Sequence, residues 1–277
     1  MNGTRGRAPH RILTRREPAD LRVGGGRSPA ALPTTPLLGG RVAARHTVQT
    51  STAAYTLVLN GPTWMGRRGV SEALAAAVAE LRAVDVTYGP LVPGSLVSRL
   101  RRGEITAEAY PPLADLVARC TAMRAATDGW FDAWAAPGGF DPGGLIKGWA
   151  IEQAAARLRA AGVKDYAVVA GADLVVNGRA PHGGPWRVAV HHPTHAATPP
   201  VRLELTRGAI GTSGVGGRRG HVIDPHTGRP VDHTHTVTVI GPDLTTADAY
   251  ATALFAVGPV DVGWFPRDGY RTLSTFR

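Results

Sequence analysis

The pattern of this 277-residue chain changes from helical to extended near residue 162, and this change limits the folds open to it. Before that point, apolar residues recur at helical spacing over 70–84, 106–126 and 145–161. After it come short β-rich runs separated by glycine and proline turns, and then a last helical segment over 244–257. Because helices and strands occur in blocks and do not alternate, the sequence predicts an α+β fold with an antiparallel or mixed sheet and packed helices.

The boundaries of these elements follow from local signals. Gly162 ends the third helix as a C′ glycine, and Pro111-Pro112 either occupies the first turn of the second helix or marks an interruption. Segments 87–103 and 128–144 contain several glycines and prolines and are expected to be mainly loop. The predicted strands are 47–59, 166–170, 173–176, 186–191, 201–205, 221–223 and 235–240.

The formal net charge of +10 is concentrated at the N-terminus. Residues 1–45 hold nine arginines and two acidic residues, which is +7 and leaves +3 for the rest of the chain. This segment is rich in Gly, Pro and Arg without a hydrophobic period, so we expect a disordered basic tail at 1–45 and one folded domain at 46–277. Because the domain itself carries little net charge, nucleic acid is not an expected partner.

Cysteine content and hydropathy exclude further classes. The single cysteine, Cys120, rules out an internal disulfide framework and argues against a cysteine-rich zinc site. No apolar run approaches the length of a membrane span, and Arg15-Arg16 is not followed by an apolar signal segment. We therefore expect a cytoplasmic protein, with an extracytoplasmic location left open if the start of the chain is misassigned.

One candidate site is the glycine turn that precedes the third helix. Gly143 and Gly144 allow a ligand to approach the backbone, and Lys147 lies on the first helical turn. Helix N-terminal amides and a cation together form an anion site. The alternative is an ordinary loop-to-helix transition with a solvated lysine. The sequence has neither a GxxxxGK[ST] P-loop nor a GxGxxG motif after a predicted strand, so classical nucleotide binding is unsupported.

A second candidate lies on the last helix. Asp248 and Thr252 are four residues apart, so their oxygens share one helix face and match the hard-oxygen ligands that Mg²⁺ prefers. Alternatively, Thr245-x-x-Asp248 is a capping box, and the Thr252 hydroxyl bonds to a backbone carbonyl. A phosphate site and a magnesium site in one chain indicate phosphoryl-transfer chemistry.

Two histidine-containing segments are further candidates for functional sites. The glycine-rich segment 211–228 joins backbone donors, hydroxyls and two arginines, and within it His221 could act as a base. The alternatives are a mobile hairpin tip and a surface histidine. The run His191-His192-Pro-Thr-His195 has no HExxH motif or cysteine ligands nearby, so we interpret it as a polar turn and not a zinc site.

Six motifs in a fixed order resemble the ApbE-type FAD:protein FMN transferases. They are FDPGGLIKGWAIE, GVKDYAVVAGADLVVNG, PWRVAVHHP, AIGTSG, HVIDPHTGRP and ADAYATALFAVG, which lie between residues 140 and 258. Asp128-Gly-Trp-Phe-Asp132 is similar to the G-x-F-D element of that family. The likeness covers nearly everything from about residue 47 onward.

The resemblance implies an ApbE-like fold and a transferase that uses Mg²⁺ to split its substrate FAD. Such an enzyme attaches FMN, through its phosphate, to a Thr or Ser hydroxyl of an acceptor flavoprotein and releases AMP. With water as the acceptor, the same chemistry would make the protein an FAD diphosphatase. A non-catalytic FAD-binding protein is the other alternative.

The resemblance also implies roles for particular residues. Asp248 and Thr252 would be magnesium ligands together with a backbone carbonyl near Ile146, and Asp248 and His221 would be catalytic. Ala172 stands where the family has the second glycine of a Gly-Gly-Asp turn. The positions implied to lie near FAD are Lys147, Gly148, Glu152, Gly171, Asp173, Ser213, Gly214 and His221.

Overall fold

A computed structural model describes residues 21–23, 35–36, 42–191, 200–214, 221–232, 235–266 and 269–275. Most of the expected N-terminal tail lies outside these residues, as do 192–195 of the histidine run and 215–220 of the glycine-rich segment. Within the tail, the structure describes two short strands and the start of a third at Val42. The domain boundary at residue 46 therefore stays a prediction.

The helices agree with the sequence patterns except that the segment 106–110, expected to be helical, precedes a helix that begins at Pro111, and that one short helix was not expected. Pro111-Pro112 occupies the first turn of its helix, and Gly162 follows the third long helix with a φ of +84°. A short helix, capped by the side chain of Ser95, lies within the segment expected to be loop. The helices are α1 Gly66–Tyr88, α2 Leu96–Arg101, α3 Pro111–Ala126, α4 Gly143–Ala160 and α5 Leu244–Val257, with a 3₁₀ turn at Thr63–Met65. No helix among the described residues is long and apolar enough to cross a bilayer.

The strands form two sheets. The larger has the order β11-β10-β9-β6-β5-β4-β3-β2 with antiparallel neighbours, and the smaller has the order β1-β7-β8 with β1 and β7 parallel. The strands are β1 Leu21–Val23, β2 Thr35–Pro36, β3 Val42–Gln49, β4 Ala54–Gly61, β5 Tyr166–Ala170, β6 Asp173–Asn177, β7 Trp186–Val190, β8 Val201–Leu205, β9 Arg207–Gly214, β10 Thr236–Gly241 and β11 Arg271–Thr275. The predicted α+β class with an antiparallel or mixed sheet is confirmed.

Two strand predictions and one loop prediction differ from the structure. The expected strand at 47–59 is the hairpin β3–β4, because the hydroxyl-rich segment 50–53 forms a turn closed by Thr50 N–H donating to Ala53 O at 2.9 Å. The start of the glycine-rich segment 211–228 is part of β9, so 211–214 is sheet and not loop. Finally, 221–223 is not a strand and forms only an isolated bridge between Ile223 and Pro230.

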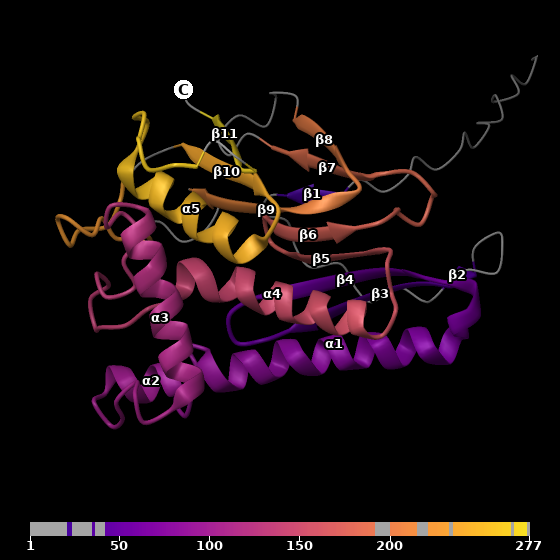
Figure 1. Cartoon of the computed structure of the whole chain (residues 1–277), viewed down its shortest axis with the longest axis horizontal. Coiled ribbons are helices and arrows are strands. Elements are labelled where there is room, and N and C mark those ends of the chain that lie inside the picture. Colours follow the sequence, from indigo (N-terminus) through magenta and orange to yellow (C-terminus); the bar gives the residue numbers. More distant parts are fainter. Residues whose placement is uncertain are drawn as a thin grey trace, which may run out of the picture.

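The larger sheet lies between two apolar layers. Helices α1, α4 and α5 run side by side across one of its faces, and α2 and α3 gather at one end of the molecule (Figure 1). Alternation along β5 and β6 divides their residues between the two layers. Val168 and Val175 pack under the helices, while Ala167, Leu174 and Val176 pack toward Trp186 and Val188 of the smaller sheet. The candidate site lies in the helix layer.

Candidate functional site

Glycines at three contacts bring α4, α5 and β9 close together. A Cβ placed on Gly148 of α4 would lie 2.7 Å from the carbonyl oxygen of Leu244, and one on Gly144 would lie 2.7 Å from Oγ1 of Thr252. A Cβ on Gly211 of β9 would lie 2.6 Å from the backbone nitrogen of Asp248. Real Cβ atoms do not approach other atoms so closely, so only glycine permits this packing. The result is that Asp248 is enclosed between a helix and a strand.

The Asp248 carboxylate is buried inside this contact, with 1% of the residue exposed. The Gly148 N–H donates to its Oδ2 at 3.1 Å, and the Lys147 ammonium lies 3.8 Å from its Oδ1. Burial raises the pKa of Asp248 to about 8 and Asp173 adds to this shift, although Lys147 and Gly148 oppose it.

The capping alternative for Asp248 is wrong. The N-cap of α5 is Asp243, whose carboxylate accepts a hydrogen bond from Thr246 N–H at 3.0 Å, so Thr245 does not begin the helix. Asp248 lies one turn further along and faces α4 and β9, where it satisfies no terminal amide of its own helix.

Lys147 and Asp173 form the shortest ion pair of the site. The Lys147 ammonium lies 2.6 Å from Oδ2 of Asp173, and the other oxygen of Asp173 accepts from Thr212 N–H at 2.7 Å. Asp173 lies opposite Ala170 in the β5–β6 pairing, so β6 and β9 both help to hold this carboxylate. Burial by itself would lower the pKa of Lys147, but the carboxylates of Asp173 and Asp248 outweigh it and raise that pKa.

The charges of this cluster fit a bound cation. Asp173 and Asp248 are both buried, and Lys147 is the single cation paired with them among the described residues. One ammonium against two carboxylates leaves an excess negative charge in a buried place, which is costly unless a further cation or proton is bound. Beside Asp248, the hydroxyls of Ser213 and Thr252 lie 3.1 Å apart and offer hard-oxygen ligands.

The donor set suits Mg²⁺ better than a metal that needs a complete protein cage. Among the described residues, no group of three or more His, Cys, Asp and Glu side chains could hold a metal ion. Magnesium commonly takes only one or two carboxylates and completes its shell with water and substrate phosphates. Asp248, Thr252 and Ser213 match that requirement. The carbonyl near Ile146, in the buried first turns of α4, stays a predicted ligand.

The first turn of α4 is less open to an anion than its sequence suggests. The Gly143 N–H donates to Oδ1 of Asp141 at 2.9 Å, and the amides of Leu145 and Ile146 both donate to Pro142 O. Since the ammonium of Lys147 also forms ion pairs with Asp173 and Asp248, little donor capacity is left for a diphosphate. The predicted phosphate contacts of Lys147 and of these amides therefore remain a prediction, and a bound cation is the stronger attraction for phosphate here.

The remaining predicted residues surround this centre at different places. Glu152 accepts from Leu244 N–H at 2.9 Å at the start of α5, and burial raises its pKa. Gly171 has a φ of +61° as the first residue of the β5–β6 turn, and such a turn tolerates a second residue other than glycine, as Ala172 is here. Gly214 ends β9, where a Cβ would lie 2.5 Å from Oγ1 of Thr236.

His221 begins the hairpin closed by the bridge between Ile223 and Pro230, and its side chain is exposed. Val222 and Val231 of this hairpin are buried in the core under the helices. The backbone of the hairpin is thus fixed on the core side of His221, while the glycine-rich residues 215–220 that precede it lie outside the described residues. The role of His221 stays a prediction.

Sequence reasoning missed the pair that holds the glycine turn. Arg101 of α2 donates to Phe140 O at 2.7 Å, and its guanidinium lies 2.9 Å from Oδ2 of Asp141. An aspartate two residues before a helix-starting glycine is a typical turn signal, so Asp141 could have been found. Arg101 could not, because its partner is 40 residues away on another element.

Comparisons with known proteins agree with this architecture. The sequence model of the ApbE family matches residues 135–268. FAD:protein FMN transferase of Escherichia coli K12 is 37% identical over 123 residues, which are 41% of this chain and 35% of that protein. The Vibrio cholerae protein of the same name is 34% identical over 124 residues, or 41% and 37% of the two chains. The chain thus spans about a third of the length of these curated relatives.

Solved structures show the same fold. Flavin Transferase ApbE from Vibrio cholerae superposes with a TM-score of 0.69 at 19% identity, covering 88% of this chain and 98% of that one. The apo form of Pseudomonas stutzeri flavinyl transferase ApbE superposes with a TM-score of 0.65 at 23% identity, covering 86% and 96%. The described chain therefore has the ApbE fold. Residues 135–268, which match the sequence model of the ApbE family, hold the whole Lys147–Asp173–Asp248 cluster.

Proposed function

We propose that this protein is a magnesium-dependent FAD:protein FMN transferase. It would transfer FMN from FAD to a Thr or Ser hydroxyl of an acceptor flavoprotein and release AMP. The observation that carries this proposal is the buried Asp248, held by Gly148 and Lys147 beside the hydroxyls of Thr252 and Ser213. This arrangement lies within the segment that matches the ApbE family, whose curated relatives bear that enzyme name.

In the proposed reaction, the acceptor oxygen forms a bond to the phosphorus of the FMN half of FAD. The bond between that phosphorus and the bridging oxygen breaks, and AMP leaves. The hydroxyl proton passes to a base, which we propose is His221. Magnesium at Asp248 and Thr252 would neutralise charge on the diphosphate. Lys147 holds Asp173 and Asp248 in place and offsets one of their two charges.

The test combines two products in one incubation. The purified protein is mixed with FAD, Mg²⁺ and candidate flavoprotein domains, and AMP is measured by chromatography. Covalent FMN on the acceptor is detected by in-gel flavin fluorescence and by mass spectrometry. AMP together with a flavin-labelled acceptor supports the proposal, and Asp248→Asn should remove both products.

The two alternatives predict other outcomes. Release of AMP without labelling of any acceptor would assign the protein as an FAD diphosphatase, in which water replaces the hydroxyl. Binding of FAD without AMP would assign it as a non-catalytic binding protein. A cytoplasmic location and a catalytically dispensable segment 1–45 belong to the same proposal, and they require fractionation and truncation experiments of their own.

A further inference from the structure

Trp134 is a half-exposed indole near the start of α4. The residue is 51% exposed, and among the large hydrophobic residues described as exposed the only other aromatic one is Trp64, at 74%. An indole left in water forgoes the free energy of burying a large apolar surface. A single exposed tryptophan needs no explanation by itself, so the case for a role depends on how the residue is held.

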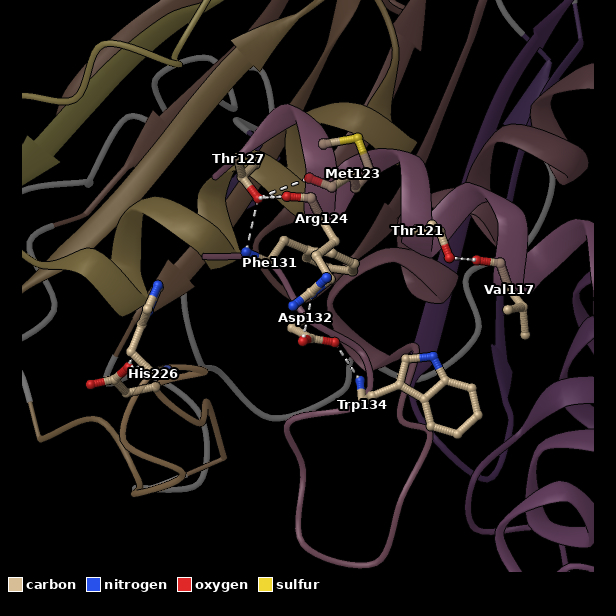
Figure 2. A network of polar contacts seen from close by, with 10 residues as sticks. Val117, Thr121, Met123, Arg124, Thr127, Phe131, Asp132, Trp134 and His226 are labelled. Atoms are coloured by element: carbon tan, nitrogen blue, oxygen red, sulfur yellow. Dashed lines mark hydrogen bonds and ion pairs between the residues drawn. The ribbon is translucent and has the colours of Figure 1, made fainter. Parts of the chain in front are cut away.

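The backbone of Trp134 is fixed by a chain of polar contacts from α3. Its N–H donates to Oδ1 of Asp132 at 2.8 Å, and Oδ2 of Asp132 pairs with Nε of Arg124 at 2.8 Å. Figure 2 shows Asp132 between these two partners, with the indole of Trp134 extending beyond them. A flexible loop tip would not need such a network.

The turn before Asp132 is held as firmly. The fully buried Thr127 donates through its hydroxyl to Met123 O at 2.8 Å and accepts from Phe131 N–H at 2.9 Å (Figure 2). Asp128 follows with a φ of +49°, which a non-glycine residue adopts at a cost. The direction in which the chain leaves α3 is therefore specified by several contacts.

The far side of Trp134 is joined to the turn that begins α4. The Asp141 N–H donates to Ala133 O at 2.6 Å, and the rings of Trp134 and Phe140 lie 5.0 Å apart at an angle of 48°. Arg101 holds Phe140 O and the Asp141 carboxylate at the same place. Trp134 is thus a rigid surface connected to the first turn of α4, the helix that carries Lys147.

We propose that Trp134 binds a planar aromatic ring of FAD by stacking. This inference rests on the proposed function, because FAD carries one ring system on each side of its diphosphate. A site that handles the diphosphate near Asp248 and Thr252 needs a ring-binding surface at some distance from these two residues. Trp134 supplies such a surface, and its contact with Phe140 joins it to the turn at the start of α4, where Gly144 packs against Thr252. Stacking accepts either isoalloxazine or adenine, since both present a flat π-face.

The experiment measures FAD affinity without turnover. FAD is titrated in excess chelator and followed by flavin fluorescence anisotropy for wild type, Trp134→Leu, Trp134→Phe and Trp64→Ala. Stacking of one ring is worth about tenfold in affinity or more, so Trp134→Leu should weaken FAD binding by at least that factor. Trp134→Phe keeps a π-face and should stay within about threefold of wild type.

Trp64→Ala is the matched control. Trp64 is the more exposed indole and contacts Gly162, at the opposite end of α4 from the glycine turn. Its removal should leave FAD affinity unchanged. Competition by AMP and by FMN then distinguishes the rings, because the variant Trp134→Leu should lose affinity for only the half of FAD that stacks on the indole.

Three results would overturn the proposal. They are unchanged FAD affinity in Trp134→Leu, an equal loss in Trp134→Phe and Trp134→Leu, and a similar loss in Trp64→Ala. Unchanged FAD affinity with slower acceptor labelling would assign Trp134 to the acceptor protein instead. Failure of the wild type to bind FAD would reject the proposed function itself, which separates that failure from a failure at Trp134.

Discussion

Replacing Gly148 by alanine tests the close contact between α4 and α5. In an unobstructed helix, alanine is more favourable than glycine by about 1 kcal/mol. At Gly148, however, the new Cβ would lie 2.7 Å from Leu244 O and 3.1 Å from Cβ of Asp248. Leu244 O is a backbone atom and cannot be moved by rotation of a side chain. Helices α4 and α5 must therefore separate. Overpacking of this kind costs roughly 1–3 kcal/mol, and the rigid contact favours the upper end.

The net expectation is a loss of about 1–2 kcal/mol in the free energy of unfolding, or roughly 2–8 °C in Tm for a domain of this size. Gly69→Ala is the matched control, because its new Cβ would meet only side-chain atoms of Met65, the residue just before α1, and this unbranched side chain can rotate away. That variant should be stabilised by up to about 1 kcal/mol. The assay is urea denaturation followed by circular dichroism, with Tm from calorimetry.

Function should change together with stability in Gly148→Ala. Separation of the helices would lengthen the hydrogen bond from Gly148 N–H to Asp248 Oδ2, now 3.1 Å, and displace that carboxylate. We expect AMP release to fall in Gly148→Ala and to be unchanged in Gly69→Ala. If Gly148→Ala were as stable as Gly69→Ala and fully active, the contact would not be tight and the account of the site would be wrong.

Three further predictions concern the chemistry and the chain ends. Asp248→Ala should abolish AMP release while far-UV circular dichroism is retained, and full activity in that variant or in excess chelator would contradict the metal assignment. His221→Ala should keep FAD affinity within a few-fold in fluorescence titration but slow acceptor labelling by ~10²–10⁴, as expected for a lost general base; equal losses in both would reject the base role. A chain that begins at Val42, and so keeps all of β3, should fold and release AMP like the full chain; aggregation would show that the preceding residues are structural.

The outline of the fold could be predicted because it depends on residues close together in sequence. The periodicity of 244–257, the C′ glycine at 162 and the β-rich run at 166–170 are local signals, and each corresponds to an element of the structure. The turn at 50–53 was not predicted, because β-branched residues on both sides of it and within it made 47–59 resemble one continuous strand. Segment 207–214 was not recognised as β9, because glycines in a strand normally weaken it. Here Gly211 is needed by the packing of α5.

For the candidate site, too, some features could be predicted from local sequence and others could not. By itself, the sequence determined which residue types were available: the i,i+4 pair of Asp248 and Thr252, the lysine at 147 and the glycine turn. The local pattern Thr245-x-x-Asp248 was also compatible with a capping role for Asp248. Only the tertiary structure decided otherwise, because Gly148 and Asp248 are 100 residues apart and meet where missing side chains let α4, α5 and β9 approach. Burial, pairing and charge imbalance arise from such long-range contacts, which no local pattern of residues encodes.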